Sequence, residues 1–208
     1  MAIRIRIRCW YRELQKGTNP KAIIELLSKD SAFQSRQFGI LDLQGRSAGH
    51  SGLTNGYVSQ DMQGRVPDTE IFYSIQGNIL RPGAVVPNAV QAFIKTNGAL
   101  TDRVMAAMEA ADGSGGDSRC TCPPWPADGS KPKIACDDKT SHIAYILMAE
   151  PEDTNGDSHN DGKYAMYITV SQPEHGPNAI KEGENLNPVK TLRMRYDVWR
   201  RAQPASFR

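Results

Sequence analysis

The stretch RQFGILDLQGRSAGHSG, residues 36–52, carries the clearest fold signal in the chain. Residues 38–43 are mostly apolar and predict a buried strand, and residues 46–51 predict the strand that returns beside it. The pair Gln44-Gly45 between them is typical of a tight turn, because glycine adopts positive φ at no steric cost. The stretch therefore predicts an antiparallel hairpin.

The segments around this hairpin alternate between helix and strand signals. NPKAIIELLSKD predicts a helix that Asn19 caps and in whose first turn Pro20 fits. The next segments predict a strand region at 71–80 and two helices at 87–98 and 100–113. Thr101 is expected to cap the second of these helices, and Gly113 to end it with positive φ. After them the sequence predicts a hairpin of strands 142–149 and 164–170 and an amphipathic helix within 189–203. This order predicts an α+β protein in which helices cover mostly antiparallel sheets.

The first residues give a conflicting signal. MAIRIRIRCWY, residues 1–11, alternates charged and apolar residues with period 2, which predicts a strand with an arginine face suited to a solvated edge. The alternative is that this start is foreign to the fold. The arginines are not followed by an apolar run of sufficient length, so the stretch does not read as a signal peptide.

Length and charge limit the classes of function. The chain has 208 residues and a formal net charge of +2. That length fits one domain, residues 1–208, with a core of its own. The charge balance argues against nucleic-acid binding, which needs a concentrated basic face. The apolar runs are all shorter than the about 20 residues that span a bilayer.

Three of the four cysteines fall in a proline-rich loop at residues 120–136. Cys120, Cys122 and Cys136 leave three readings open: a disulfide from Cys136 to Cys120 or Cys122, free thiols, or a metal site with His142 as fourth ligand. A disulfide that closes a loop of about 15 residues contributes roughly 3 kcal/mol. Cys9 is then left as a free thiol.

A polar loop at residues 150–163 is the best metal candidate. It presents side-chain oxygens at alternate positions, as Ca²⁺ prefers, from Asp153, Asn155, Asp157 and Asp161. The EF-hand pattern fails, because Ser158 stands at the sixth position and Tyr164 at the twelfth. The competing interpretation is a solvated hairpin loop that ends in an Asp-Gly turn. Calcium is thus the only cofactor that the sequence suggests.

Two further motifs are weak by themselves. Gly49-His50-Ser51-Gly52 is not a nucleophile elbow, because Leu53 occupies the place of the second glycine. Asp117 and Arg119, two apart, would point to the same side of a strand. They could orient a catalytic group, or form a surface ion pair of little energetic weight.

The order of several motifs resembles the bacterial and archaeal family called domain of unknown function 1028. The likeness spans roughly residues 12–122 and rests on three motifs together: Arg36-Gln37-Phe38-Gly39, Gln76-Gly77-Asn78 and Gly116-Asp117-Ser118-Arg119. That family looks like the N-terminal-nucleophile hydrolases. The resemblance implies a four-layer αββα sandwich in which an N-terminal Thr, Ser or Cys attacks an amide carbonyl, with its own amine as base.

The resemblance also assigns roles to three residues. Asn78 is expected to hydrogen-bond a substrate carbonyl or its oxyanion, and Asp117 and Arg119 to orient nucleophile or substrate. Family members carry roughly 50–60 residues before the first helix, so we expect this chain to lack two inner strands and the nucleophile. As written it is expected to be inactive, with association into homo-oligomers through open sheet edges.

Two functions follow as expectations. The first is an N-terminal-nucleophile amide hydrolase, or a fragment of one. The second is a non-catalytic module that binds a glycan, peptide or peptidoglycan-type ligand of the cell envelope, with help from Ca²⁺ at residues 153–161. The expected compartment is periplasmic or secreted if the natural start carries a signal peptide, and cytoplasmic as the sequence is written.

Overall fold

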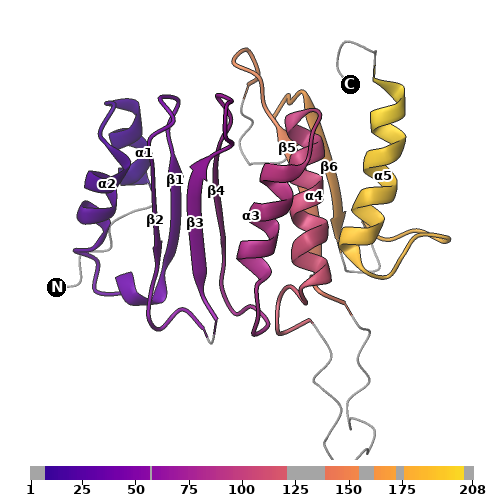
Figure 1. The fold of residues 1–208 in the computed structure, drawn as a ribbon, viewed down its shortest axis with the longest axis horizontal. Coiled ribbons are helices and arrows are strands. Elements are labelled where there is room, and N and C mark those ends of the chain that lie inside the picture. Colours follow the sequence, from indigo (N-terminus) through magenta and orange to yellow (C-terminus); the bar gives the residue numbers. More distant parts are fainter. Residues whose placement is uncertain (1–7, 57, 121–138, 155–161, 172–175, 204–208) are drawn as a thin grey trace, which may run out of the picture.

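A computed structural model of the chain describes residues 8–56, 58–120, 139–154, 162–171 and 176–203. The elements follow one another along the long axis of the molecule in nearly their sequence order (Figure 1). They are α1 (Arg8–Gln15), α2 (Pro20–Leu27), a short 3-10 helix (Phe33–Ser35), β1 (Gln37–Leu41), β2 (Ser47–Ser51), β3 (Gln60–Arg65), β4 (Phe72–Gly77), α3 (Val85–Lys95), α4 (Leu100–Gly113), β5 (Ile143–Met148), β6 (Met166–Ser171) and α5 (Pro188–Ala202). The described strands form three two-stranded antiparallel sheets, β1–β2, β3–β4 and β5–β6.

The first two hairpins lie between helices. Ile23 and Leu27 of α2 are buried against Ile40 of β1. The opposite face of the β1–β2 hairpin packs on β3–β4, and Val86 and Val90 of α3 cover the far side of β4. Figure 1 shows this order of helix, hairpin, hairpin and helix.

Two glycines let the hairpins approach each other closely. A Cβ at Gly39 of β1 would lie 2.0 Å from Oε1 of Gln76 on β4, and a Cβ at Gly49 of β2 would lie 2.1 Å from Oδ1 of Asp61 on β3. The space that core side chains usually fill between sheets is therefore occupied by polar side chains that face glycine backbone.

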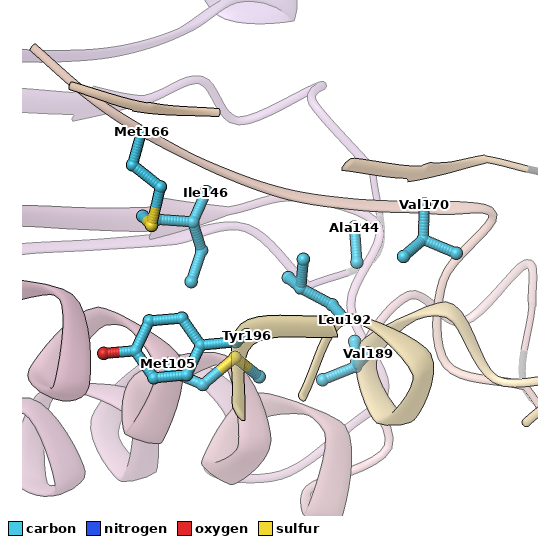
Figure 2. Close-up of a cluster of buried hydrophobic side chains, with 8 residues drawn as sticks. All are labelled: Met105, Ala144, Ile146, Met166, Val170, Val189, Leu192 and Tyr196. Carbon is cyan, nitrogen blue, oxygen red and sulfur yellow. The ribbon is translucent and has the colours of Figure 1, made fainter. Parts of the chain in front are cut away.

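The third hairpin forms a separate core with α4 and α5. Figure 2 shows side chains of β5 and β6 above those of the two helices, with Leu192 and Tyr196 of α5 in the centre. The other face of this hairpin is bare, because Ile143 and Tyr145 are 55% and 51% exposed. The described hairpin is thus covered on one side only.

A charged network fastens α5 to the start of α4. Asp102 accepts hydrogen bonds from the backbone N–H of Ala99, from the hydroxyl of Tyr196 and from the guanidinium of Arg200. Burial alone would raise the pKa of the Asp102 carboxyl, but these hydrogen bonds outweigh it and hold the pKa below its usual value. Burial and the neighbouring carboxylate raise the pKa of Tyr196 to about 12.

A groove of about 470 Å³ runs beside β4. Its lining includes Tyr73 and Ile75 of β4 and Val104 and Met108 of α4, and it is mostly apolar. β4 pairs with β3 alone among the described strands, so the second edge of β4 is open toward this groove. No described helix is long and apolar enough to cross a membrane.

The structure confirms a mixed α/β protein with small antiparallel sheets, including the hairpin at residues 37–51, the Asn19 cap, the β5–β6 hairpin and the C-terminal helix. The strand expected over residues 1–11 is wrong from Arg8 onward, where α1 begins because Trp10 and Leu14 pack on α2. Residues 1–7 lie outside the described residues.

Thr101 does not cap α4. Ala99 is the capping residue, and Asp102 accepts a hydrogen bond from its backbone N–H, while Thr101 is buried and accepts from the Tyr196 hydroxyl. The helix ends at Gly113 as predicted, but the expected positive φ falls on Gly115 and Gly116 instead.

We predict that Gly52→Ala destabilises the fold by about 2 kcal/mol through overpacking. A Cβ at Gly52 would lie 2.1 Å from the backbone oxygen of Gln34, which cannot move as a side chain would. Chemical denaturation measures the change. Gly113→Ala is the matched control, since a Cβ there meets nothing within 4 Å. Equal midpoints for the two variants would contradict the close approach at Gly52.

We predict that Asp102→Asn lowers the free energy of unfolding by about 2 kcal/mol at pH 7, since it removes a charge-assisted hydrogen-bond acceptor. The folded-state pKa of Asp102 is lowered, so its contribution is present above the unfolded-state pKa of about 3.9 and is lost as the pH falls through the folded-state value. The gap between wild type and variant therefore shrinks below about pH 4. Asp197→Asn, which alters a longer and only partly buried pair with Arg193, is the control and should change less. A difference in unfolding free energy that does not change with pH would contradict the lowered pKa of Asp102.

Candidate functional site

The contact between the first two hairpins is organised by the side-chain amide of Gln37. Its nitrogen donates to Ser51 Oγ at 2.9 Å, to the carbonyl of Gly77 at 2.9 Å and to the carbonyl of Gln60 at 3.1 Å, with Ser59 Oγ at 3.3 Å. One amide group thus ties the start of β1 to the end of β2, the start of β3 and the end of β4. We call the polar layer between these hairpins the seam.

Ser51 and His50 point to opposite sides of β2. Ser51 Oγ donates to Asp61 at 2.7 Å while it accepts from Gln37. The His50 ring stacks on Phe33 with centroids 3.6 Å apart, on the side that α2 covers. Alternation along the strand therefore separates the imidazole from the hydroxyl, and Gly49–Gly52 is not a nucleophile elbow.

The segment that leads from β2 into β3 holds two buried polar atoms without a hydrogen-bond partner in the described part of the chain. They are the side-chain nitrogen of Asn55 and the side-chain oxygen of Gln60. Asn55 also accepts a hydrogen bond from the side chain of Asn78, at 3.3 Å. Gln60 points to the other face of β3, because its neighbour Asp61 faces the seam, so the free donor beside Asn78 is that of Asn55.

The loop after β4 interlocks with the turn after α4. Leu80 and Asp117 form an antiparallel bridge, and the backbone N–H of Arg81 donates to the carbonyl of Gly116 at 2.9 Å. The carbonyl of Ile79 accepts both from the backbone N–H of Ser118 at 2.8 Å and from its hydroxyl at 2.7 Å. The motifs at residues 76–78 and 116–119 therefore lie side by side.

Asp117 and Arg119 pair with each other at the rim of this turn. Arg119 Nε and the Arg119 backbone N–H reach Asp117 Oδ1 at 2.9 and 2.8 Å. Burial alone would raise the pKa of the Asp117 carboxyl, but the hydrogen bonds from Arg119 leave it below its usual value. The two residues belong to a turn rather than the expected strand, and the Arg119 side chain is 60% exposed. Their expected roles, like that of Asn78, stay predictions.

The cysteine and metal expectations fall mostly outside the described residues. Cys120 is a free thiol whose pKa burial raises, so the thiolate is disfavoured. Of the readings left open, the free thiol is the one that the structure has at Cys120, and Cys122 and Cys136 are not described. No described residues gather into a metal-binding group of three. Asp153 accepts from the backbone of Glu150 and Ala165. Asn155, Asp157 and Asp161 are not described, so calcium stays a prediction.

The hairpin seam and the interlocked turns define a mixed α/β protein with a polar site at one end of two facing sheets. The chain belongs to the family of unknown function DUF1028, whose model matches residues 8–122. Among solved structures, a DUF1028 protein from Silicibacter pomeroyi is 26% identical, with a TM-score of 0.44, over 51% of this chain and 48% of that one. The chain spans about half the length of that protein. No curated protein matches it.

Sequence reasoning placed Asn78 at this site but missed the residues that surround it. Asn55, Gln60 and Asp61 come from a segment with no recognised strand signal, and Gln37 was part of a motif without a role. The Asn55-Gly56 pair, a common turn signal, was the one local hint that a loop would bend here.

We predict that Gln37→Glu destabilises the chain by about 2 kcal/mol at neutral pH, because it replaces a donor with a charged acceptor among four acceptors. Protonation would restore a donor, so the loss shrinks as the pH is lowered. Urea denaturation across pH measures both effects. Gln91→Glu on the exposed side of α3 is the control. A Gln37 variant no less stable than this control would show that the hydrogen bonds of the Gln37 amide are not needed for stability.

Proposed function

We propose that the chain carries the substrate-holding part of an amide hydrolase of the N-terminal-nucleophile type. The observation that carries the proposal is the unpartnered buried nitrogen of Asn55, which lies beside the side chain of Asn78. A buried polar group without a partner costs about 1–3 kcal/mol, and the carbonyl of a bound amide would recover that cost. The helix, hairpin, hairpin, helix order of residues 8–95 supports the αββα sandwich that the family resemblance implies.

Each residue at the seam has a role in this proposal. The amide nitrogens of Asn55 and Asn78 would donate to the substrate carbonyl and to the oxyanion that forms on attack. Asp117 and Arg119 lie on the segment adjacent to Asn78 and would bind polar groups at the rim. Their mutual pairing limits this to a supporting role.

The attacking group would come from outside the described residues. The hydroxyl of Ser51 is engaged by Asp61 and Gln37, and burial disfavours the thiolate of Cys120. We therefore propose that the attacking group is contributed by residues outside those that the structure describes.

The second candidate is a binding module without catalysis. The same free donor of Asn55 favours it, because it recognises an amide carbonyl whether or not a nucleophile arrives. Peptides and the N-acetyl groups of envelope glycans both offer such an amide. Calcium at residues 153–161 would be an addition to this module and is a separate proposal.

We predict that the chain binds N-acetylglycinamide through Asn55 and Asn78. Titration followed by ¹⁵N NMR should shift the side-chain amide signals of Asn55 and Asn78. Asn55→Leu should weaken binding at least about tenfold, the equivalent of one lost hydrogen bond. Asn88→Ala is the control, because Asn88 is exposed and bonds Ser114. NMR shifts confined to other residues, or an Asn55 variant that binds the probe as tightly as the wild type, would refute the proposed binding site.

Turnover separates the two candidates. The full-length product of the natural gene is incubated with amide and muropeptide substrates. Hydrolysis that disappears when the mature first residue is changed supports the hydrolase, and binding without hydrolysis supports the module.

A further inference from the structure

Ile79 has an unusual backbone conformation for its residue type. Its φ is 52°, in the left-handed region, where a β-branched residue is a genuine outlier. Asp68 is the other described non-glycine residue with positive φ, at 59°, and it lies in the β3–β4 turn, where aspartate tolerates this conformation. Turn chemistry accounts for Asp68 and does not account for Ile79.

The neighbours of Ile79 hold it in place from two sides. The Ser118 hydroxyl and backbone N–H both donate to its carbonyl, at 2.7 and 2.8 Å. On the other side Gly56 lies so close that a Cβ on it would be 2.5 Å from Ile79 Cγ1. Gly56 follows Asn55, and Ile79 follows Asn78, so the contact fixes the two asparagines relative to each other.

Resting on the proposed function, we propose that Ser118 is a positioning residue. It holds Ile79 in the strained conformation and so fixes the Asn78 amide against Asn55 before a ligand binds. Strain that persists because surrounding groups over-determine it is a means of preorganising a site. Ser118 would thus act through Ile79 and Asn78, and it does not itself touch the ligand.

The first test establishes the strain. Replacement of Ile79 by Ala and by Gly removes the same packing, so the two variants differ only in backbone freedom. At an ordinary position Gly is the less stable of the two, whereas at a left-handed position Gly is the more stable. We expect the Gly variant at position 79 to melt about 2–4 °C above the Ala variant, and the reverse order at Ile75 on β4. The same order at both positions would overturn the inference.

The second test establishes the role of Ser118. Ser118→Ala should broaden or double the side-chain amide signal of Asn78 and weaken N-acetylglycinamide binding about tenfold, and Ser118→Thr should restore both. Ser114→Ala, in the same turn but bonded to Ala110, is the control. In an Ile79→Gly background the effect of Ser118→Ala should shrink, because less strain remains to be held.

The results separate this inference from the proposed function. If the wild-type chain does not bind the probe, the proposed function fails, and the Asn78 signal and the non-additivity of the two substitutions still decide the role of Ser118. An Asn78 signal unchanged in Ser118→Ala, or effects that simply add, would overturn that role.

Discussion

The close contact of the first two hairpins is the constraint on which the described site depends. Gly39 and Gly49 carry no side chains that would hold the sheets apart. The opposing side chains of Gln76 and Asp61 therefore lie directly against the glycine backbone. A gap this narrow has no room for an ordinary apolar core and is filled by hydrogen-bonding groups instead. Each of these must find a partner, because an unsatisfied buried group costs more than a made hydrogen bond contributes. The two N–H groups of the Gln37 amide lie within hydrogen-bond distance of four acceptors, and the buried nitrogen of Asn55 is left without a partner among the described residues.

Local signals predicted much of the fold. The hairpin at residues 36–52, the Asn19 cap and the β5–β6 hairpin depend on turn residues, capping and period-2 alternation, all of which act between neighbours in sequence. Prediction from the sequence failed for the segments whose structure is decided by contacts with distant parts of the chain. β3 was missed because its inward residues, among them Asp61 and Gln63, face another polar sheet and show no apolar alternation. α1 was read as a strand because the alternation of residues 1–7 was extended across Arg8.

The site was predicted only as far as a family resemblance reached. It named Asn78, Asp117 and Arg119, and the structure brings their backbones together through the bridge between Leu80 and Asp117. The ion pair of Asp117 and Arg119 was one of two readings that the sequence left open, whereas the contact of Asn55 with Asn78 was not predicted. That contact joins residues 23 apart and arises only when the loops after β2 and β4 meet.

Unpaired buried polar atoms and backbone strain occur close together where the loops after β2 and β4 meet. Two of the four buried unpartnered side-chain atoms in the described chain belong to Asn55 and Gln60, and the one strained β-branched residue, Ile79, packs on the glycine next to Asn55. Elsewhere local preference and fold agree: Asn19 and Asn187 cap their helices and Gly45 turns its hairpin. A stable fold would relax a single defect of either kind by a change of residue, with glycine in place of Ile79 or an apolar side chain in place of Gln60. The free nitrogen of Asn55 and the strain at Ile79 occur together beside Asn78, which is the arrangement that the proposed amide-binding site would require.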